Sequence, residues 1–161
     1  MKKVIFRILS FILALLVGVS CSEELVPTPN TYSKILTGET SKSWKLEAIS
    51  LEIEGKADQT FELPNNCVYD DYYVFYANSE RLFEVDEGGS KCAPEDPEIY
   101  LTDNWSLVNA NATLTFVFPV LAEVRLPYIV NLLTDDKMIL EIFFNEDKSN
   151  YRMVFKKVSE N

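Results

Sequence analysis

The feature that most constrains this fold is a series of eight strand-like segments, joined by short polar links and with no helix of crossover length between them. The segments cover about 44–54, 70–77, 80–86, 101–109, 112–118, 123–133, 137–145 and 149–158. Their links are rich in Asn, Asp, Ser and Thr, which suit hairpin turns. Parallel strands need a long crossover connection, so these neighbours are predicted to pair antiparallel.

Alternation of apolar and polar residues identifies the buried face of most of these strands. In 112–118, Leu114, Phe116 and Phe118 share one face, and the residues between them share the other. Eight up-and-down strands can close on themselves, and closure removes the exposed edges of an open sheet. We therefore predict an all-β fold, an eight-stranded antiparallel up-and-down barrel, with a two-sheet sandwich as the alternative. One short helical turn is predicted before the first strand, over 31–38.

The N-terminus has the order of an export signal. Residues 1–20 begin with three basic side chains, continue with an apolar stretch over 8–19 and end on a serine. The apolar stretch is shorter than the ~20 residues that a membrane-spanning helix needs. We therefore predict a signal peptide over 1–20.

The residues around the cleavage point resemble a bacterial lipobox, at which the new N-terminal cysteine is acylated. Cys21 follows the small residues Gly18 and Ser20, and the acidic triplet 22–24 resembles a surface-export signal. We expect a lipid on Cys21, a flexible tether over 21–32 and one domain over 33–161. The expected location is the outer membrane, with exposure at the cell surface as an option; ordinary signal cleavage is the alternative to lipidation.

Charge limits the partners of the mature chain. Residues 1–20 hold three of the fifteen basic residues and none of the twenty-five acids, so the mature chain has a net charge of −13. Such a surface disfavours nucleic acid and anionic lipid as partners. The acyl chain is therefore expected to hold the protein to its membrane.

Three blocks of the chain resemble the lipocalin-like lipoproteins of Gram-negative bacteria. Residues 36–46, LTGETSKSWKL, are similar to the family's opening motif, in which a Gly precedes K-x-W-x-L. Residues 67–92 resemble its C-x-x-D-D-x-Y-x-F element with a second cysteine, and Trp105 with Leu107 matches a later strand. The resemblance covers nearly the whole mature chain. It implies an eight-stranded calyx and says little about activity.

The cysteines favour one disulfide. Lipidation of Cys21 leaves Cys67 and Cys92 as an even pair in an oxidising compartment, at the two ends of the second and third strands. A redox or metal pair is the alternative, but the spacing is not C-x-x-C and the chain has no histidine. We therefore predict a Cys67–Cys92 disulfide.

Catalytic chemistry has little support in the sequence. The absence of histidine removes the commonest general base and metal ligand. Adjacent acids such as Asp70 and Asp71 point to opposite faces of an extended strand, so they do not form one active site. We expect no enzyme, no cofactor and no metal; a weak calcium site near 86–98 is the alternative.

Ten side chains are predicted to line the barrel. They are Tyr73, Phe75, Phe83, Trp105, Phe116, Phe118, Leu140, Ile142, Met153 and Phe155. Aromatic residues fill a small barrel or line a cavity within it. We expect a lipoprotein whose barrel binds a small apolar or amphipathic molecule. The alternative is an interaction module with a solid core that presents loops such as 87–100 to another envelope or secreted protein, and a packed interior with an exposed apolar patch would favour it.

The resemblance also implies how the barrel is closed. In lipocalins a tryptophan at the start of the first strand sits over the closed end, and a cation from the last strand packs across its ring. Trp44 matches the first position. Lys157 keeps the inward phase of the last strand and lies at the correct end, so we predict a contact between Lys157 and the indole of Trp44.

Overall fold

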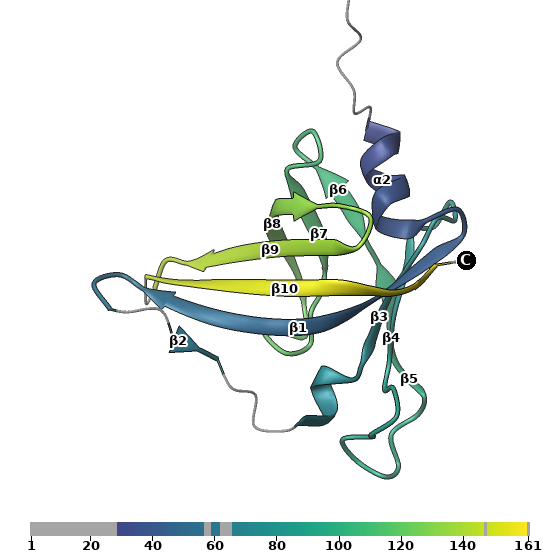
Figure 1. Cartoon of the computed structure of the whole chain (residues 1–161), viewed down its shortest axis with the longest axis horizontal. Coiled ribbons are helices and arrows are strands. Elements are labelled where there is room, and N and C mark those ends of the chain that lie inside the picture. Colours follow the sequence, from purple (N-terminus) through teal and green to yellow (C-terminus); the bar gives the residue numbers. More distant parts are fainter. Residues whose placement is uncertain (1–28, 57–58, 62–65, 147, 161) are drawn as a thin grey trace, which may run out of the picture.

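The computed structural model describes residues 29–56, 59–61, 66–146 and 148–160 (Figure 1). The predicted signal peptide and Cys21 lie outside these residues. The helices are α2 (Pro29–Thr37) and the 3-10 helix η1 (Asn66–Tyr69). The strands are β1 (Ser41–Ile53), β2 (Gln59–Thr60), β3 (Tyr72–Tyr76), β4 (Leu82–Asp86), β5 (Ile99–Asn104), β6 (Ser106–Val108), β7 (Thr113–Val117), β8 (Arg125–Leu133), β9 (Lys137–Phe144) and β10 (Ser149–Glu160).

Nine of the strands form one antiparallel path that nearly closes into a barrel. The order is β5-β4-β3-β1-β10-β9-β8-β7-β6, and the short β2 pairs with β1 beside this path. The first and last strands of the path, β5 and β6, follow each other in the chain and are separated by Trp105 alone. The predicted all-β barrel is therefore confirmed, and the single path excludes two separate sheets.

The break at Trp105 divides the strand predicted over 101–109 into two. The Trp105 backbone N–H donates to the carbonyl of Arg81 at 2.9 Å, and its indole N–H donates to the carbonyl of Tyr76 at 3.0 Å. The side chain is 3% exposed. The Trp105 backbone therefore keeps the β4–β5 register while its indole bonds the end of β3, and the chain changes its partner from β4 to β7 immediately after it.

The predicted helical turn is confirmed as α2. Gly38 ends it with a backbone φ of 65°, a left-handed conformation that glycine adopts without steric cost. The Gly38 N–H donates to the carbonyl of Lys34 at 2.8 Å. The helix begins at Pro29, so its first turn overlaps the segment predicted as tether.

The two ends of the barrel differ. In Figure 1, α2 lies at one end, beside the start of β1 and the C-terminus, and we call this the helix end. The antiparallel register places the β4–β5 connection (87–98) and the β7–β8 connection (118–124) at the opposite end, which we call the mouth. The long strands β1, β10 and β9 lie next to one another in this order and extend between the helix end and the mouth.

Candidate functional site

The ten side chains predicted to line the barrel are all buried, with at most 7% of their surface exposed. Their rings contact one another: the centroids of Phe75 and Phe83 lie 4.8 Å apart, and those of Tyr73 and Phe118 lie 5.4 Å apart. Side chains therefore fill the described part of the interior, as expected of a barrel of this size. A role of these residues in binding a ligand stays a prediction.

A cavity opens at the mouth. It has a volume of about 260 Å³ and is lined by Leu121, Phe144, Glu146 and Tyr151. The Tyr151 ring packs edge-on against those of Phe144 and Phe61, with centroids 5.7 Å apart in both pairs. Walls that combine apolar side chains with polar groups suit a small amphipathic molecule.

A buried carboxyl group lies at the start of β3. Asp71 is 1% exposed, and the Tyr100 hydroxyl donates a hydrogen bond to its Oδ2 at 3.1 Å. Burial raises the pKa of Asp71 to about 7, although the hydrogen bond from Tyr100 acts in the opposite direction. The carboxylates of Glu87, Asp70 and Asp86 add to the increase in pKa. Asp71 therefore changes its charge near neutral pH.

Two buried phenol groups lie deeper in the barrel. Tyr73 and Tyr128 are 0% exposed, and neither hydroxyl has a hydrogen-bond partner among the described residues. Burial raises the pKa of both phenols. At Tyr128 the backbone amide of Phe118 offsets part of this increase, although it forms no hydrogen bond with the hydroxyl. Both groups therefore stay neutral at physiological pH.

The predicted disulfide is confirmed. Cys67 and Cys92 are bonded with their Cα atoms 5.3 Å apart, and the bond joins η1 to the β4–β5 connection. Beside it the chain passes very close to itself: a Cβ atom on Gly88 would lie 2.3 Å from the backbone oxygen of Asp70. Gly88 also has a φ of 66°, so this position requires glycine for two reasons. The disulfide and this close approach together hold the β4–β5 connection against the start of β3. We call this connection, residues 87–98, the mouth loop.

Two acids near the disulfide, Asp70 before β3 and Glu87 after β4, accept hydrogen bonds from backbone N–H groups. Asp70 Oδ2 accepts a hydrogen bond from the Gly89 N–H at 3.0 Å, and Glu87 Oε2 accepts one from the Cys92 N–H at 3.1 Å. Within the described part of the chain, no group of three or more acid or cysteine side chains is placed to hold a metal ion. The calcium alternative near 86–98 therefore has no geometric support there.

The predicted barrel-closing residues are in register. Trp44 lies opposite Lys157 in the β1–β10 pairing, is 0% exposed and donates its indole N–H to the carbonyl of Leu36 at 2.9 Å. The ammonium group of Lys42 lies over the Trp44 ring, with its Nζ 5.6 Å from the ring centroid. Lys157 Nζ binds Asp135 Oδ2 at 2.8 Å. The register of the pair is confirmed, and the contact of Lys157 with the indole stays a prediction.

Lys42 is a residue whose role the sequence analysis missed. Its side chain is 0% exposed, and its Nζ donates to the carbonyl of Ile35 and to Asp135 Oδ1, both at 2.9 Å. It therefore joins α2, β1 and the β8–β9 hairpin. Hydrogen bonds from Lys157 and Lys42 lower the pKa of Asp135 to about 2. The sequence contains one signal for this role. Lys42 lies two residues before Trp44, so the alternation of side chains along a strand places both on the inward face.

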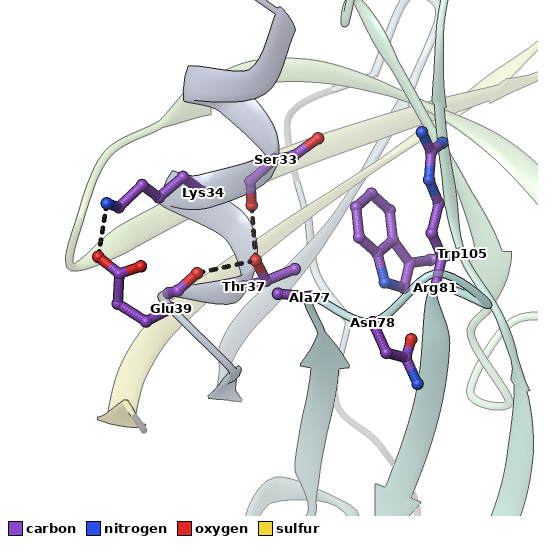
Figure 2. A pocket seen from close by; sticks show the side chains of 9 residues that line it. Ser33, Lys34, Thr37, Glu39, Ala77, Asn78, Arg81 and Trp105 are labelled. Atoms are coloured by element: carbon purple, nitrogen blue, oxygen red, sulfur yellow. Dashed lines mark hydrogen bonds and ion pairs between the residues drawn. The ribbon is translucent and has the colours of Figure 1, made fainter.

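A second cavity lies at the helix end, between α2 and the β3–β4 hairpin (Figure 2). It has a volume of about 310 Å³, and its walls include Ser33 and Thr37 on one side and Asn78, Arg81 and Trp105 on the other. The guanidinium carbon of Arg81 lies 5.3 Å from the centroid of the Trp105 ring. We call this cavity the helix-side cleft. Its walls come from segments distant in sequence, so no local pattern predicts it.

No protein-family model matches the chain, and no curated protein matches it. Among the residues that the structure describes, no helix is both long and apolar enough to cross a membrane. The barrel itself, broadly lipocalin-like, is what links this chain to a known architecture, and an architecture of this kind does not specify a function.

Proposed function

We propose that this chain is a lipid-anchored interaction module of the bacterial envelope, whose solid barrel presents its outer surface to another envelope or secreted protein. The observation that carries the proposal is the filled interior, in which the ten predicted lining residues pack against their neighbours. A ligand within the barrel would displace rings whose burial contributes roughly 1.5 to 3 kcal/mol each. The filled interior therefore favours a binding surface outside the barrel.

The outer face of β8 and β9 offers such a surface. Ile129, Leu132 and Phe143 are 50%, 38% and 54% exposed, and we call these three residues the β8–β9 surface. Ile129 lies opposite Glu141, whose carboxylate forms an ion pair with Arg152 at 2.5 Å. Apolar side chains beside a charged pair match the centre and rim of a protein interface.

Photo-crosslinking in cells tests this surface. A photoreactive phenylalanine analogue at Phe143 is expected to give a discrete crosslinked product with a protein partner. The same analogue at Val158, which is 45% exposed near the end of β10, is the matched control and is expected to give none. Adding Ile129→Glu should abolish the product at position 143, because a charge within an apolar contact is costly to desolvate. The same crosslinked products from the analogue at Phe143 and at Val158 would contradict the proposal.

Binding of a small amphipathic molecule is the second candidate, and the cavity at the mouth favours it. Native mass spectrometry of the protein purified from its own envelope separates the two candidates. The interaction module is expected to appear at the mass of the processed chain without a small ligand. A co-purified small molecule that is lost on Leu121→Glu would instead support binding at the mouth.

The proposed anchor has its own test. Cys21→Ser should abolish acylation and move the protein out of the membrane fraction, in a soluble or an uncleaved form, because the acidic chain has little electrostatic attraction to anionic lipid. Fractionation followed by intact-mass measurement gives the location and the processing state. A processed Cys21→Ser protein that stays tightly bound to membranes would refute lipid anchoring.

A further inference from the structure

Arg81 differs from the other arginines of the described chain. Arg125 pairs with Asp103, and Arg152 pairs with Glu141. Arg81 makes no ion pair among the described residues, although acids outnumber bases twenty-five to fifteen in the whole chain. Its guanidinium group lies instead over an indole ring. The guanidinium N–H donors therefore have no acidic partner in the described part of the chain, and such donors bind a planar or tetrahedral oxyanion.

The β3–β4 hairpin holds Arg81 in an unfavourable backbone conformation. Its φ is 54°, in the left-handed region that is unfavourable for a residue with a Cβ atom. The Arg81 N–H donates to the carbonyl of Asn78 at 3.1 Å, and the Asn78 side chain accepts a hydrogen bond from the Leu82 N–H at 2.9 Å. These bonds fix the base of the side chain. The turn residues Asn109, Ala110, Asn111 and Lys148 have the same left-handed conformation, so it fixes where Arg81 lies and does not by itself mark a site.

The opposite wall of the helix-side cleft supplies a second donor. Figure 2 shows the Ser33 side chain directed from α2 toward the side on which Arg81 and Trp105 lie. The Ser33 hydroxyl has no hydrogen-bond partner within the described part of the chain, whereas the hydroxyl of Thr37 donates to the Ser33 carbonyl at 2.9 Å. A group entering the cleft therefore meets an unused hydroxyl on one side and a guanidinium edge on the other.

The remaining charges of the cleft compensate each other. Lys34 and Glu39, which also line it, form an ion pair at 2.5 Å. Arg81 therefore supplies the net positive charge of this cavity. Because the mature chain carries a net charge of −13, its long-range field repels anions. An anion that binds in this cleft is therefore held by the groups that line it and not by the overall charge of the protein.

We propose that the helix-side cleft binds a phosphate-type oxyanion, held by the guanidinium edge of Arg81 with the Ser33 hydroxyl as second donor. This site goes beyond the β8–β9 surface and is formed by different elements. Two sources carry the required chemistry, the headgroup of a membrane lipid and free phosphate. A headgroup is within reach if Cys21 is acylated, because α2 begins eight residues later and eight extended residues span about 26 Å.

Titration with inorganic phosphate tests the site. The full-length protein, as processed by the cell, is placed in micelles of a neutral detergent, and phosphate replaces chloride at constant ionic strength. The readout is the pair of indole N–H signals in NMR from the two tryptophans. The Trp105 signal is expected to shift and saturate, because phosphate drawn to Arg81 alters the cation over that ring. The Trp44 signal, from a fully buried indole, is expected to stay constant.

Charge-matched variants separate the local site from general electrostatics. Arg81→Gln should weaken phosphate binding by roughly tenfold or more, since charge-assisted hydrogen bonds are lost. Arg152→Gln changes the net charge equally at a different place and should leave the titration unchanged, whereas Arg81→Lys should retain part of the affinity. Equal curves for Arg81→Gln and Arg152→Gln, or a shift that never saturates, would overturn the proposal.

Nanodiscs that contain phosphatidylglycerol distinguish the two sources. If the headgroup is the ligand, the Trp105 signal of the wild-type protein in nanodiscs is already shifted relative to Arg81→Gln, and added phosphate has little further effect. If free phosphate is the ligand, the signal moves only as phosphate is added. An absence of any Arg81-dependent shift in both settings refutes the site and leaves the β8–β9 proposal untouched, because that proposal is tested by crosslinking.

Discussion

Replacing Asp71 with Asn is expected to stabilise the protein at pH 8 by roughly 2 to 4 kcal/mol while leaving its stability at pH 4 nearly unchanged. Burial raises the pKa of this carboxyl from 3.8 to about 7 in the folded chain. Between about pH 4 and pH 7 the folded state keeps a proton that the unfolded state has lost. The free energy of unfolding contributed by Asp71 therefore falls as pH rises through this window, and asparagine removes the dependence.

Urea denaturation of the wild-type protein and the variant at pH 4, 5.5, 7 and 8 measures this effect. Glu95→Gln is the matched control, because it removes one negative charge from an exposed position of the same mouth loop. The control should follow the wild-type pH dependence. If Asp71→Asn gains no stability at pH 8, or if its stability falls with pH as steeply as the wild-type value, the Asp71 carboxyl is not the source of the dependence.

Replacing Lys42 with Ala is expected to lower the free energy of unfolding by about 3 kcal/mol. The substitution removes buried methylene groups worth roughly 0.8 kcal/mol each and leaves the carbonyl of Ile35 without the hydrogen bond from Nζ. The ion pair with Asp135 contributes less, because that carboxylate is 71% exposed and regains water. The loss of stability should therefore follow the removal of packing and of the bond to α2.

Two further variants separate these contributions. Lys42→Met keeps most of the buried stem and should cost about 1 to 2 kcal/mol. Lys45→Ala is the control on the opposite face of β1, where the ammonium lies 4.4 Å from the Tyr72 ring centroid, and it should cost below about 1 kcal/mol. Urea denaturation followed by tryptophan fluorescence gives all three values. Equal losses for Lys42→Ala and Lys45→Ala would show that the buried cation does not stabilise the helix end.

The strand pattern predicted most of the fold because it depends on local chemistry. Alternation along 112–118 placed Leu114 and Phe116 on the inner face, and both are 1% exposed in the barrel. The pairing of Cys67 with Cys92 followed from the number of cysteines and their place around a hairpin. The alternation is a local signal, and the cysteine pairing rests on the cysteine count and on the expected lipid on Cys21, so neither prediction required a known tertiary contact.

The break at Trp105 and the position of Arg81 could not be predicted in this way. The Trp105 N–H still bonds the carbonyl of Arg81 in the β4–β5 register, its indole N–H reaches the carbonyl of Tyr76, and the chain pairs with β7 from the next residue on. The helix-side cleft likewise combines α2 with the β3–β4 hairpin. Such features depend on how elements pack, and hydrophobic alternation contains no information on which hairpin a given indole will meet.

Sequence alone determined the class of this protein, an antiparallel barrel of up-and-down strands with one disulfide, because turn residues and residue phase act locally and the cysteines can be counted along the chain. Tertiary structure decided how that barrel is packed. Only the packed chain shows that aromatic rings fill its interior, that Lys42 lies over Trp44, and that burial raises the pKa of Asp71 to about 7. Packing volume, burial and charge proximity arise from residues far apart in the chain, and a one-dimensional pattern does not encode their distances.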